Sequence, residues 1–211
     1  MRIAELWRYP VKSMGGEPLE RADLGEDGIR GDRALAVFDA AGNLLTARTR
    51  PRLLAHRAAI GPDGEPLVDG RPWRDPAVAR DVEAAAGPGA HLRRVSGPER
   101  FDVLPLLVAT DGAIASLGYD RRRFRPNLLV GGVPGLEERT WEGRVLRAGP
   151  CLVAARELRG RCVMTTFDPD TQAQDPNVLR RIVREMDGTL ALDCSVVRGG
   201  TLRVGDPVEL D

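Results

Sequence analysis

The chain has 211 residues, of which 29% are charged, and its formal net charge at pH 7 is zero. A chain of this length can bury a core of its own and falls between one large domain and two small ones. The balanced charge gives no global field that would attract nucleic acid or a membrane surface, so any cationic site must be local.

The first half of the chain is predicted to be mostly sheet. Pro10 ends a first extended segment, because the residue before a proline is biased away from helix. The pair Gly42-Asn43 supplies the positive φ values that a hairpin turn needs. Val78 and Val82 recur at helical spacing, and Gly87 can end the helix they indicate. The expected strands cover residues 3–9, 35–39, 44–47, 57–60, 66–69 and 91–95.

The run from Ser96 to Glu99, with glycine and proline at its centre, is the strongest boundary signal in the sequence. It predicts two domains, residues 1–97 and 98–211. In the second half, Thr110 or Asp111 can cap a short helix, and Pro176 suits the first turn of a helix over residues 176–187. The expected strands cover residues 104–109, 128–130, 145–148, 152–155, 162–166, 190–197, 201–204 and 208–210. The predicted fold class is therefore mainly β with a few helices.

No stretch of the sequence resembles a signal peptide or approaches the roughly 20 apolar residues of a membrane helix. We therefore expect a cytoplasmic protein with no membrane partner. The three cysteines are an odd number without CxxC spacing, which argues against a disulfide framework, a zinc knuckle and an iron–sulfur cluster. The two histidines stand far apart, without acidic neighbours at metal-ligand spacing, so histidine chemistry is not expected.

One of the three cysteines differs from the other two. Cys151 and Cys194 share strand parity with apolar residues and are predicted to be small core side chains. Cys162 instead follows Arg159 and Arg161 and precedes a polar run of threonines and aspartates. Only a thiolate binds a soft metal well, and thiolates need positive surroundings. Cys162 is therefore the candidate metal ligand.

The basic residues provide a second signal. Lys12 is the only lysine beside 30 arginines, and a compact ammonium is not interchangeable with a planar guanidinium at a tight anion site. Arg125 and Asn127, held by a proline before a strand, could grip a phosphate. We interpret residues 121–123 as a solvated charged turn. RNA binding by this cluster is a weaker alternative, because the segment has one phenylalanine and the chain has no net charge. Glycine-rich phosphate loops and a serine nucleophile elbow are absent.

Several short runs together resemble the MOSC domain proteins that carry an N-terminal MOSC companion domain, a family that includes the mitochondrial amidoxime-reducing component and its bacterial relatives. The runs occur in the family's order from one end of the chain to the other. They are Tyr9-Pro10-Val11-Lys12-Ser13, Gly31-Asp32-Arg33, Thr46-Ala47-Arg48, Pro51-Arg52-Leu53, Phe124-Arg125-Pro126-Asn127, Arg161-Cys162, Thr165-Thr166, Asp168-Pro169-Asp170-Thr171 and Gly205-Asp206-Pro207-Val208.

This resemblance implies a molybdenum cofactor, a pterin whose dithiolene holds the metal and whose phosphate the protein must anchor. Cys162 matches the cysteine that ligates molybdenum. The resemblance also implies two closely packed β-barrel-like domains with the cofactor site between them. It associates the family with pyridoxal phosphate binding as well. The positions carried over as cofactor-binding are Lys12, Ser13, Arg33, Thr110, Arg125, Asn127, Arg161 and Cys162.

The activity that the resemblance implies is a molybdenum-dependent reduction of small N-hydroxylated compounds, such as amidoximes and hydroxylamines, by removal of oxygen. Cys162 and Asp168 are the expected catalytic residues, with Asp168 orienting nearby groups. Because the sequence has no flavin, haem or iron–sulfur motif, electrons are expected from a separate donor protein that carries such a group. We expect a monomer that does not bind nucleic acid. The alternative is a carrier that holds the cofactor, or sulfur on Cys162, without turnover.

The sequence also departs from the family pattern. Gly160 stands where serine or proline is common, and Gln172 stands where glycine is usual. Asp193 and Cys194 occupy a stretch that is usually aromatic. These departures concern the pocket wall and the substrate range more than the metal ligand.

Overall fold

The computed structural model describes the backbone of residues 1–211 and every side chain except that of Glu99. Its central sheet has eight strands in the order β17-β13-β14-β15-β11-β12-β1-β2. Only β11 and β12 pair in parallel, so the sheet is mixed. Its strands are β1 (Arg2–Arg8), β2 (Glu17–Leu19), β11 (Leu106–Thr110), β12 (Leu128–Gly131), β13 (Val145–Ala148), β14 (Cys151–Gly160), β15 (Thr189–Arg198) and β17 (Val208–Leu210).

Three smaller sheets of three strands each complete the β structure, in the orders β10-β5-β6, β16-β3-β4 and β7-β8-β9. Among the described residues no sheet closes into a barrel, so the β-rich fold is as expected while the barrel-like shape of each half is not seen. The strands are β3 (Arg21–Gly25), β4 (Gly28–Ile29), β5 (Leu35–Phe38), β6 (Leu44–Leu45), β7 (Ala58–Ile60), β8 (Pro66–Val68), β9 (Arg71–Pro72), β10 (His91–Arg94) and β16 (Gly200–Arg203).

Each α-helix begins directly after a capping side chain, and the cap of the second helix is as the sequence predicts. The side chain of Asp75 caps α1 (Pro76–Ala86), Thr110 caps α2 (Asp111–Leu117) and Asp175 caps α3 (Pro176–Met186), each by accepting a backbone N–H of the first turn. The 3₁₀ turns are η1 (Pro51–Ala55), η2 (Pro98–Arg100), η3 (Arg121–Arg123), η4 (Glu137–Thr140) and η5 (Val163–Thr166). None of the described helices is long and apolar enough to cross a membrane.

The strand predicted over residues 162–166 is wrong. The chain leaves β14 at Gly160 and forms the 3₁₀ turn η5 directly after Cys162. The hydroxyl of Thr165 donates to the carbonyl of Cys162 at 2.9 Å, and that of Thr166 donates to the carbonyl of Val163 at 2.7 Å. Threonines favour strands, but here their hydroxyls bond to nearby backbone and hold a tight turn instead.

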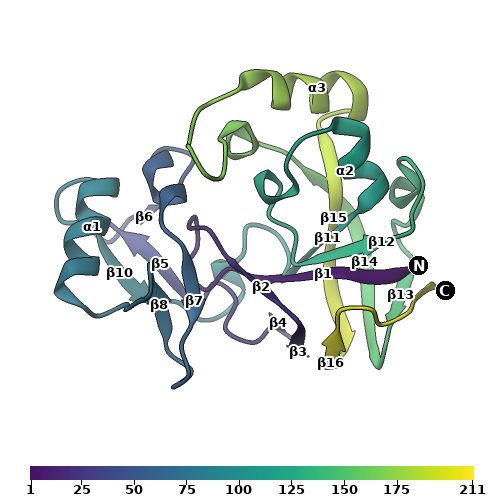
Figure 1. The fold of residues 1–211 in the computed structure, drawn as a ribbon, viewed down its shortest axis with the longest axis horizontal. Helices are drawn as coiled ribbons and strands as arrows, with labels where there is room; N and C mark the ends of the chain where they lie inside the picture. Colours follow the sequence, from purple (N-terminus) through teal and green to yellow (C-terminus); the bar gives the residue numbers. More distant parts are fainter.

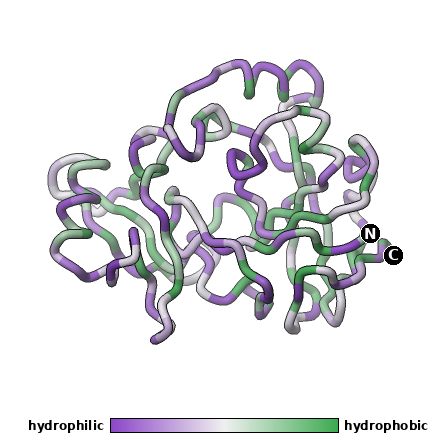
Figure 2. The backbone as a smooth tube through the Cα atoms, viewed as in Figure 1, coloured by the Kyte–Doolittle hydropathy of each residue, from purple (hydrophilic) through white to green (hydrophobic). Residues whose placement is uncertain are grey.

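The molecule has two lobes with separate hydrophobic cores (Figure 1). The smaller lobe packs α1 against β5, β8 and β10, with Val11, Leu35 and Val82 in its core. The larger lobe holds the central sheet, with α2 and α3 beside it. The hydrophobic stretches follow the buried strands of both lobes, whereas the loops at the outside are hydrophilic (Figure 2).

The first strand of the chain belongs to the larger lobe. β1 pairs with β12 and β2, and Ile3 and Leu6 are buried in the core of the central sheet. The chain therefore starts in the larger lobe and crosses near Tyr9 to place Val11 and Met14 in the core of the smaller lobe. It then returns to the larger lobe for β2 to β4, and it crosses again to form β5 to β10 in the smaller lobe. The division into residues 1–97 and 98–211 stays a prediction. The crossing near Tyr9 brings residues from both halves to one cavity.

Candidate functional site

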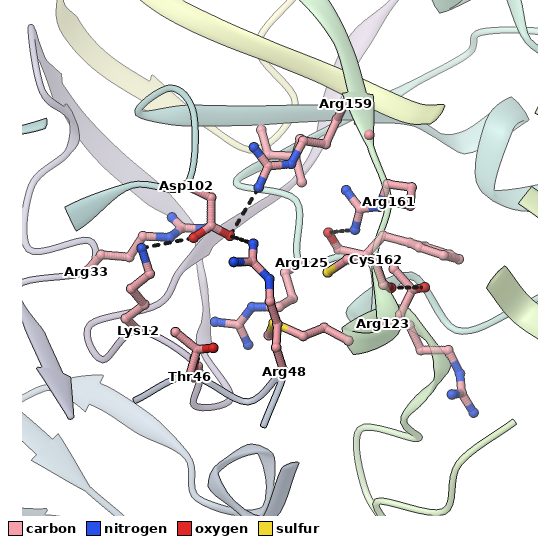
Figure 3. Close-up of a pocket in the computed structure, with 16 residues that line it drawn as sticks. Lys12, Arg33, Thr46, Arg48, Asp102, Arg123, Arg125, Arg159, Arg161 and Cys162 are labelled. Atoms are coloured by element: carbon pink, nitrogen blue, oxygen red, sulfur yellow. Dashed lines mark hydrogen bonds and ion pairs between the residues drawn. The ribbon is translucent and has the colours of Figure 1, made fainter. Parts of the chain in front are cut away.

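A cavity lies between the lobes and is lined by an unusual concentration of positive charge (Figure 3). Asp102 is its one acidic side chain among the described residues. The seven basic side chains that line it are Lys12, Arg33, Arg48, Arg123, Arg125, Arg159 and Arg161. Ser13, Thr46, Met164 and Thr165 also line it, together with Cys162. Six residues predicted as cofactor-binding therefore meet here, although they come from four separate parts of the chain.

Lys12 is held at this cavity by the crossing segment after β1. Its backbone N–H donates to the carbonyl of Leu35 at 2.8 Å, which ties the segment to β5. The side chain is 10% exposed, and its ammonium donates to the carbonyl of Arg100 at 3.0 Å. The hydroxyl of the next residue, Ser13, accepts the backbone N–H of Ala47 at 3.0 Å. The lone lysine thus lines the cationic cavity, and its role at an anion site stays a prediction.

Asp102 joins three of the basic side chains. Its carboxylate lies 2.9 Å from the ammonium of Lys12 and 3.1 Å from the guanidinium groups of Arg48 and Arg159. Burial is the largest influence on the carboxyl and raises its pKa. Lys12, Arg48 and Arg159 together outweigh burial, so the pKa of Asp102 is lowered overall. Asp102 is a charged acceptor within a cationic cavity.

Cys162 stands apart from the other cysteines, as its surroundings predict. Cys151 and Cys194 are buried, and burial raises the pKa of both thiols. Cys162 is partly exposed and lines the cavity at the start of η5. Arg48 lines the same cavity, and the nearness of Cys162, followed by the charge of Asp102, raises the pKa of the Arg48 guanidinium. Cationic neighbours of this kind surround metal-binding and reactive thiols in proteins.

Arg125 and Arg161 are half-buried, and burial disfavours the charged form of each guanidinium. The pKa of Arg161 is lowered to about 10 by burial and then by the charge of Arg159, and burial also lowers the pKa of Arg125 to about 10. Arg161 Nη2 donates to the carbonyl of Phe124 at 2.8 Å, but its buried Nε has no partner among the described residues. A buried donor without a partner costs about 1–3 kcal/mol, so Arg161 has a donor available for a ligand.

Backbone strain gathers at the same cavity. Ser13, Arg33 and Arg125 adopt positive φ values of 73°, 49° and 56°, which side chains other than glycine rarely accept. All three are predicted cofactor-binding residues. Strained residues of this kind cluster at functional sites, where the surrounding structure holds them. Gln172, which replaces the usual glycine of the resemblance, also has a positive φ of 58°.

Three predicted site residues do not line this cavity. Thr110 caps α2, and its hydroxyl donates to buried Glu138 at 2.9 Å. Asn127 is fully buried and ties β12 to β1 and β11, with only a 3.4 Å contact to Arg33 on the cavity side. Asp168 lies behind Arg123, which it pairs with at 2.9 Å. The cofactor and catalytic roles of these residues stay predictions.

Sequence reasoning missed three lining residues and assigned another to solvent. Arg48 stands in a run that carried the resemblance, and Arg159 was noted only as a neighbour of Cys162. Asp102 lies in a segment without any motif, so no signal could have found it. Arg123 was assigned to a charged turn, yet it lines the cavity. The interpretation holds for its neighbours, because Arg121 pairs with Glu5 and Arg122 pairs with Asp120 and Asp170.

Comparison with known proteins matches nearly the whole chain. Residues 1–83 match the MOSC N-terminal beta barrel domain, and residues 110–209 match the MOSC domain. "Mitochondrial amidoxime reducing component 2" of Macaca fascicularis is 27% identical, and its Homo sapiens counterpart is 28% identical. Each match covers 98% of this chain and 82% of the relative. The solved structure of the YuaD protein from Bacillus subtilis has the same fold, with a TM-score of 0.54, 15% identity, and coverage of 99% of this chain and 94% of that one.

Proposed function

Because the chain belongs to the MOSC domain proteins that carry a MOSC N-terminal beta barrel domain, we propose that it binds a molybdenum cofactor and reduces N-hydroxylated compounds. The observation that carries the proposal is the partly exposed thiol of Cys162 within a cavity of seven basic side chains. The curated relatives are named for amidoxime reduction. Those names support the choice of substrate class.

The residues present fit the cofactor. A pterin phosphate is an anion, and the cavity provides forked guanidinium donors and one ammonium for it. The buried Nε of Arg161, for which the described part of the chain provides no acceptor, is a donor that a ligand could satisfy. A cysteine sulfur is a soft ligand of the type that thiolate-binding metals prefer. The donor set thus matches both ends of a cofactor that carries a metal and a phosphate.

Each side chain of the cavity has a definable task. Lys12, Arg33 and Arg125 would neutralise the phosphate, and Cys162 would hold the metal. Arg48, which lines the cavity with Cys162, would keep that sulfur oriented. The ion pair between Arg123 and Asp168 would fix the wall behind η5. When bound, the cofactor would supply the two-electron reduction that removes oxygen from the substrate. A separate redox protein would deliver the electrons.

Metal analysis tests this proposal. The chain is produced in a host that synthesises the cofactor, and molybdenum is measured in the unmodified protein, Cys162→Ala and the matched control Cys151→Ala. We expect stoichiometric molybdenum, and amidoxime reduction with a chemical reductant, in the unmodified protein and the control. Cys162→Ala should lose both. Molybdenum far below stoichiometric and equal in all three proteins would contradict the proposal. Stoichiometric metal without reduction would favour the carrier alternative.

A further inference from the structure

A second cavity adjoins the cationic one and differs from it in chemistry. Its apolar side chains come from both lobes and are Trp7, Tyr9, Leu54, Met164 and Phe167. The two cavities share three wall residues, Arg123, Arg125 and Met164. Met164 is two positions after Cys162 in η5, so the apolar cavity opens beside the candidate metal ligand. Neither the sequence patterns nor the family resemblance assigns a role to this cavity.

One wall of the second cavity is a fixed aromatic surface. The rings of Trp7 and Tyr9 are stacked, with centroids 6.4 Å apart and planes 20° apart. The hydroxyl of Tyr9 donates to the carbonyl of Pro126 at 3.2 Å, and the indole N–H of Trp7 donates to Glu5 at 2.7 Å. The backbone of Gly16 lies so close to this wall that a Cβ there would be 2.5 Å from the Tyr9 ring. These contacts hold the two rings in place before any ligand arrives.

The charges around the second cavity are mostly neutralised. Asp170 pairs with Arg57 from the smaller lobe at 2.8 Å and with Arg122 from the larger lobe at 2.6 Å. Arg123 pairs with Asp168. Arg125 is the exception: among the described side chains it forms no salt bridge, and its guanidinium lies 4.2 Å from the Tyr9 ring centroid. The cavity therefore offers apolar and aromatic faces, with one unneutralised cation at the wall shared with the cationic cavity.

We propose that this second cavity is the subsite that binds an aromatic ring of the substrate. A planar apolar ring would pack between the stacked rings on one side and Leu54 and Phe167 on the other. Its polar N-hydroxylated end would extend past Met164 toward the Cys162 side of the shared wall. The inference rests on the proposed function, and it predicts a preference for aromatic over small aliphatic N-hydroxylated compounds.

A cavity-filling variant tests the subsite. Leu54→Trp places a larger side chain in the cavity, and Leu44→Trp, at an exposed position of β6, is the matched control. We expect Leu54→Trp to lower the ratio of kcat/KM for benzamidoxime to kcat/KM for acetamidoxime by about tenfold, because burial of a ring stabilises binding by more than 1.4 kcal/mol. Leu44→Trp should leave the ratio unchanged. An unchanged ratio in Leu54→Trp with normal molybdenum content would overturn the inference. Loss of molybdenum from Leu54→Trp but not from Leu44→Trp would also overturn it, because the second cavity would then hold the cofactor.

A binding measurement separates the subsite from the proposed function. Benzamidoxime should quench the tryptophan fluorescence of the unmodified protein, and this quenching should be lost in Trp7→Phe. In Leu54→Trp the benzamidoxime affinity measured from the quenching should fall about tenfold. Acetamidoxime should not quench. If the loaded protein reduces neither compound but benzamidoxime still quenches through Trp7, the reductase proposal fails while the aromatic subsite stands. Absence of quenching with benzamidoxime would overturn the subsite, whatever activity the protein has.

Discussion

The ammonium of Lys12 lies 2.9 Å from the carboxylate of Asp102, and this pair joins the crossing segment after β1 to the segment before β11. The same carboxylate also bonds to Arg48 and Arg159. Asp102 is the one acidic side chain among the described residues of the cationic cavity. An anionic ligand would therefore compete with the Asp102 carboxylate for the same cationic side chains.

The first prediction is that Asp102→Asn strengthens anion binding. Removal of a like charge beside the bound anion is worth about 1 kcal/mol even at the dielectric constant of water, so inorganic pyrophosphate should bind the cofactor-free variant about fivefold more tightly. Isothermal titration calorimetry at low salt measures this. Asp187→Asn is the control, because the Asp187 side chain is 93% exposed and does not line the cavity. Equal or weaker pyrophosphate affinity in Asp102→Asn would count against the competition.

The second prediction concerns pH. The pKa of Asp102 is lowered in the folded protein, so its charge contributes stability that is fully present above the unfolded pKa of about 3.9 and is lost as pH falls through the folded pKa. Without an anion, Asp102→Asn should be less stable than the unmodified protein by a constant amount between about pH 5 and 8. This difference should shrink below about pH 4. Urea unfolding across the range measures it, and a difference that grows in acid would contradict the assignment.

The third prediction concerns the thiols. Cys162 is partly exposed, whereas Cys151 and Cys194 are buried and the pKa of each of their thiols is raised. A thiol reagent should therefore modify a single cysteine in the folded, cofactor-free protein and all three in denaturant. Mass spectrometry should locate the native modification at Cys162, and Cys162→Ser should abolish it. Rapid native modification of Cys194 would show that the core around β15 opens more readily than its packing indicates.

The fourth prediction separates backbone from charge at Arg125. Its φ of 56° is strained for any residue but glycine, at a cost of about 1–2 kcal/mol, which the extra chain entropy of glycine partly offsets. Arg125→Gly should therefore be more stable than Arg125→Ala by about 0.5–1 kcal/mol. Both variants should lose pyrophosphate affinity by the same factor, because both lose the guanidinium. Chemical denaturation of the two variants measures the difference in stability, and calorimetry measures their pyrophosphate affinities. Unequal affinities would mean that the backbone rather than the charge determines binding.

Much of the fold followed from local signals. Thr110 predicted the start of α2 and Pro176 predicted the first turn of α3, because these signals act within their own turn. The cap of α1 by Asp75 was missed, although it is a signal of the same kind. The strand predicted after Cys162 failed because threonine hydroxyls can bond to nearby backbone, which strand propensity does not register.

The site was predictable only in part. Cys162 and Lys12 were conspicuous by their neighbours and their rarity, so the sequence alone could single them out. Asp102 was not, because its importance arises from three partners far away in the chain. The aromatic wall was missed for the same reason: Trp7 and Tyr9 are ordinary strand residues until Met164 and Phe167 are brought opposite them. Contacts between residues so far apart in the chain produce no periodic pattern in the sequence.

The position of β1 also determines when the cavity can exist during folding. β1 pairs with β12, and Ile3 exchanges backbone hydrogen bonds with Gly205 and Asp206. The crossing segment that carries Lys12 and Ser13 thus depends on contacts with residues near the other end of the sequence, and contacts so far apart in sequence form slowly. The basic side chains would therefore come together late in folding, after the central sheet has brought β1 beside its distant partners. Cofactor capture would then require the folded sheet, and a partly folded chain could not trap the cofactor prematurely.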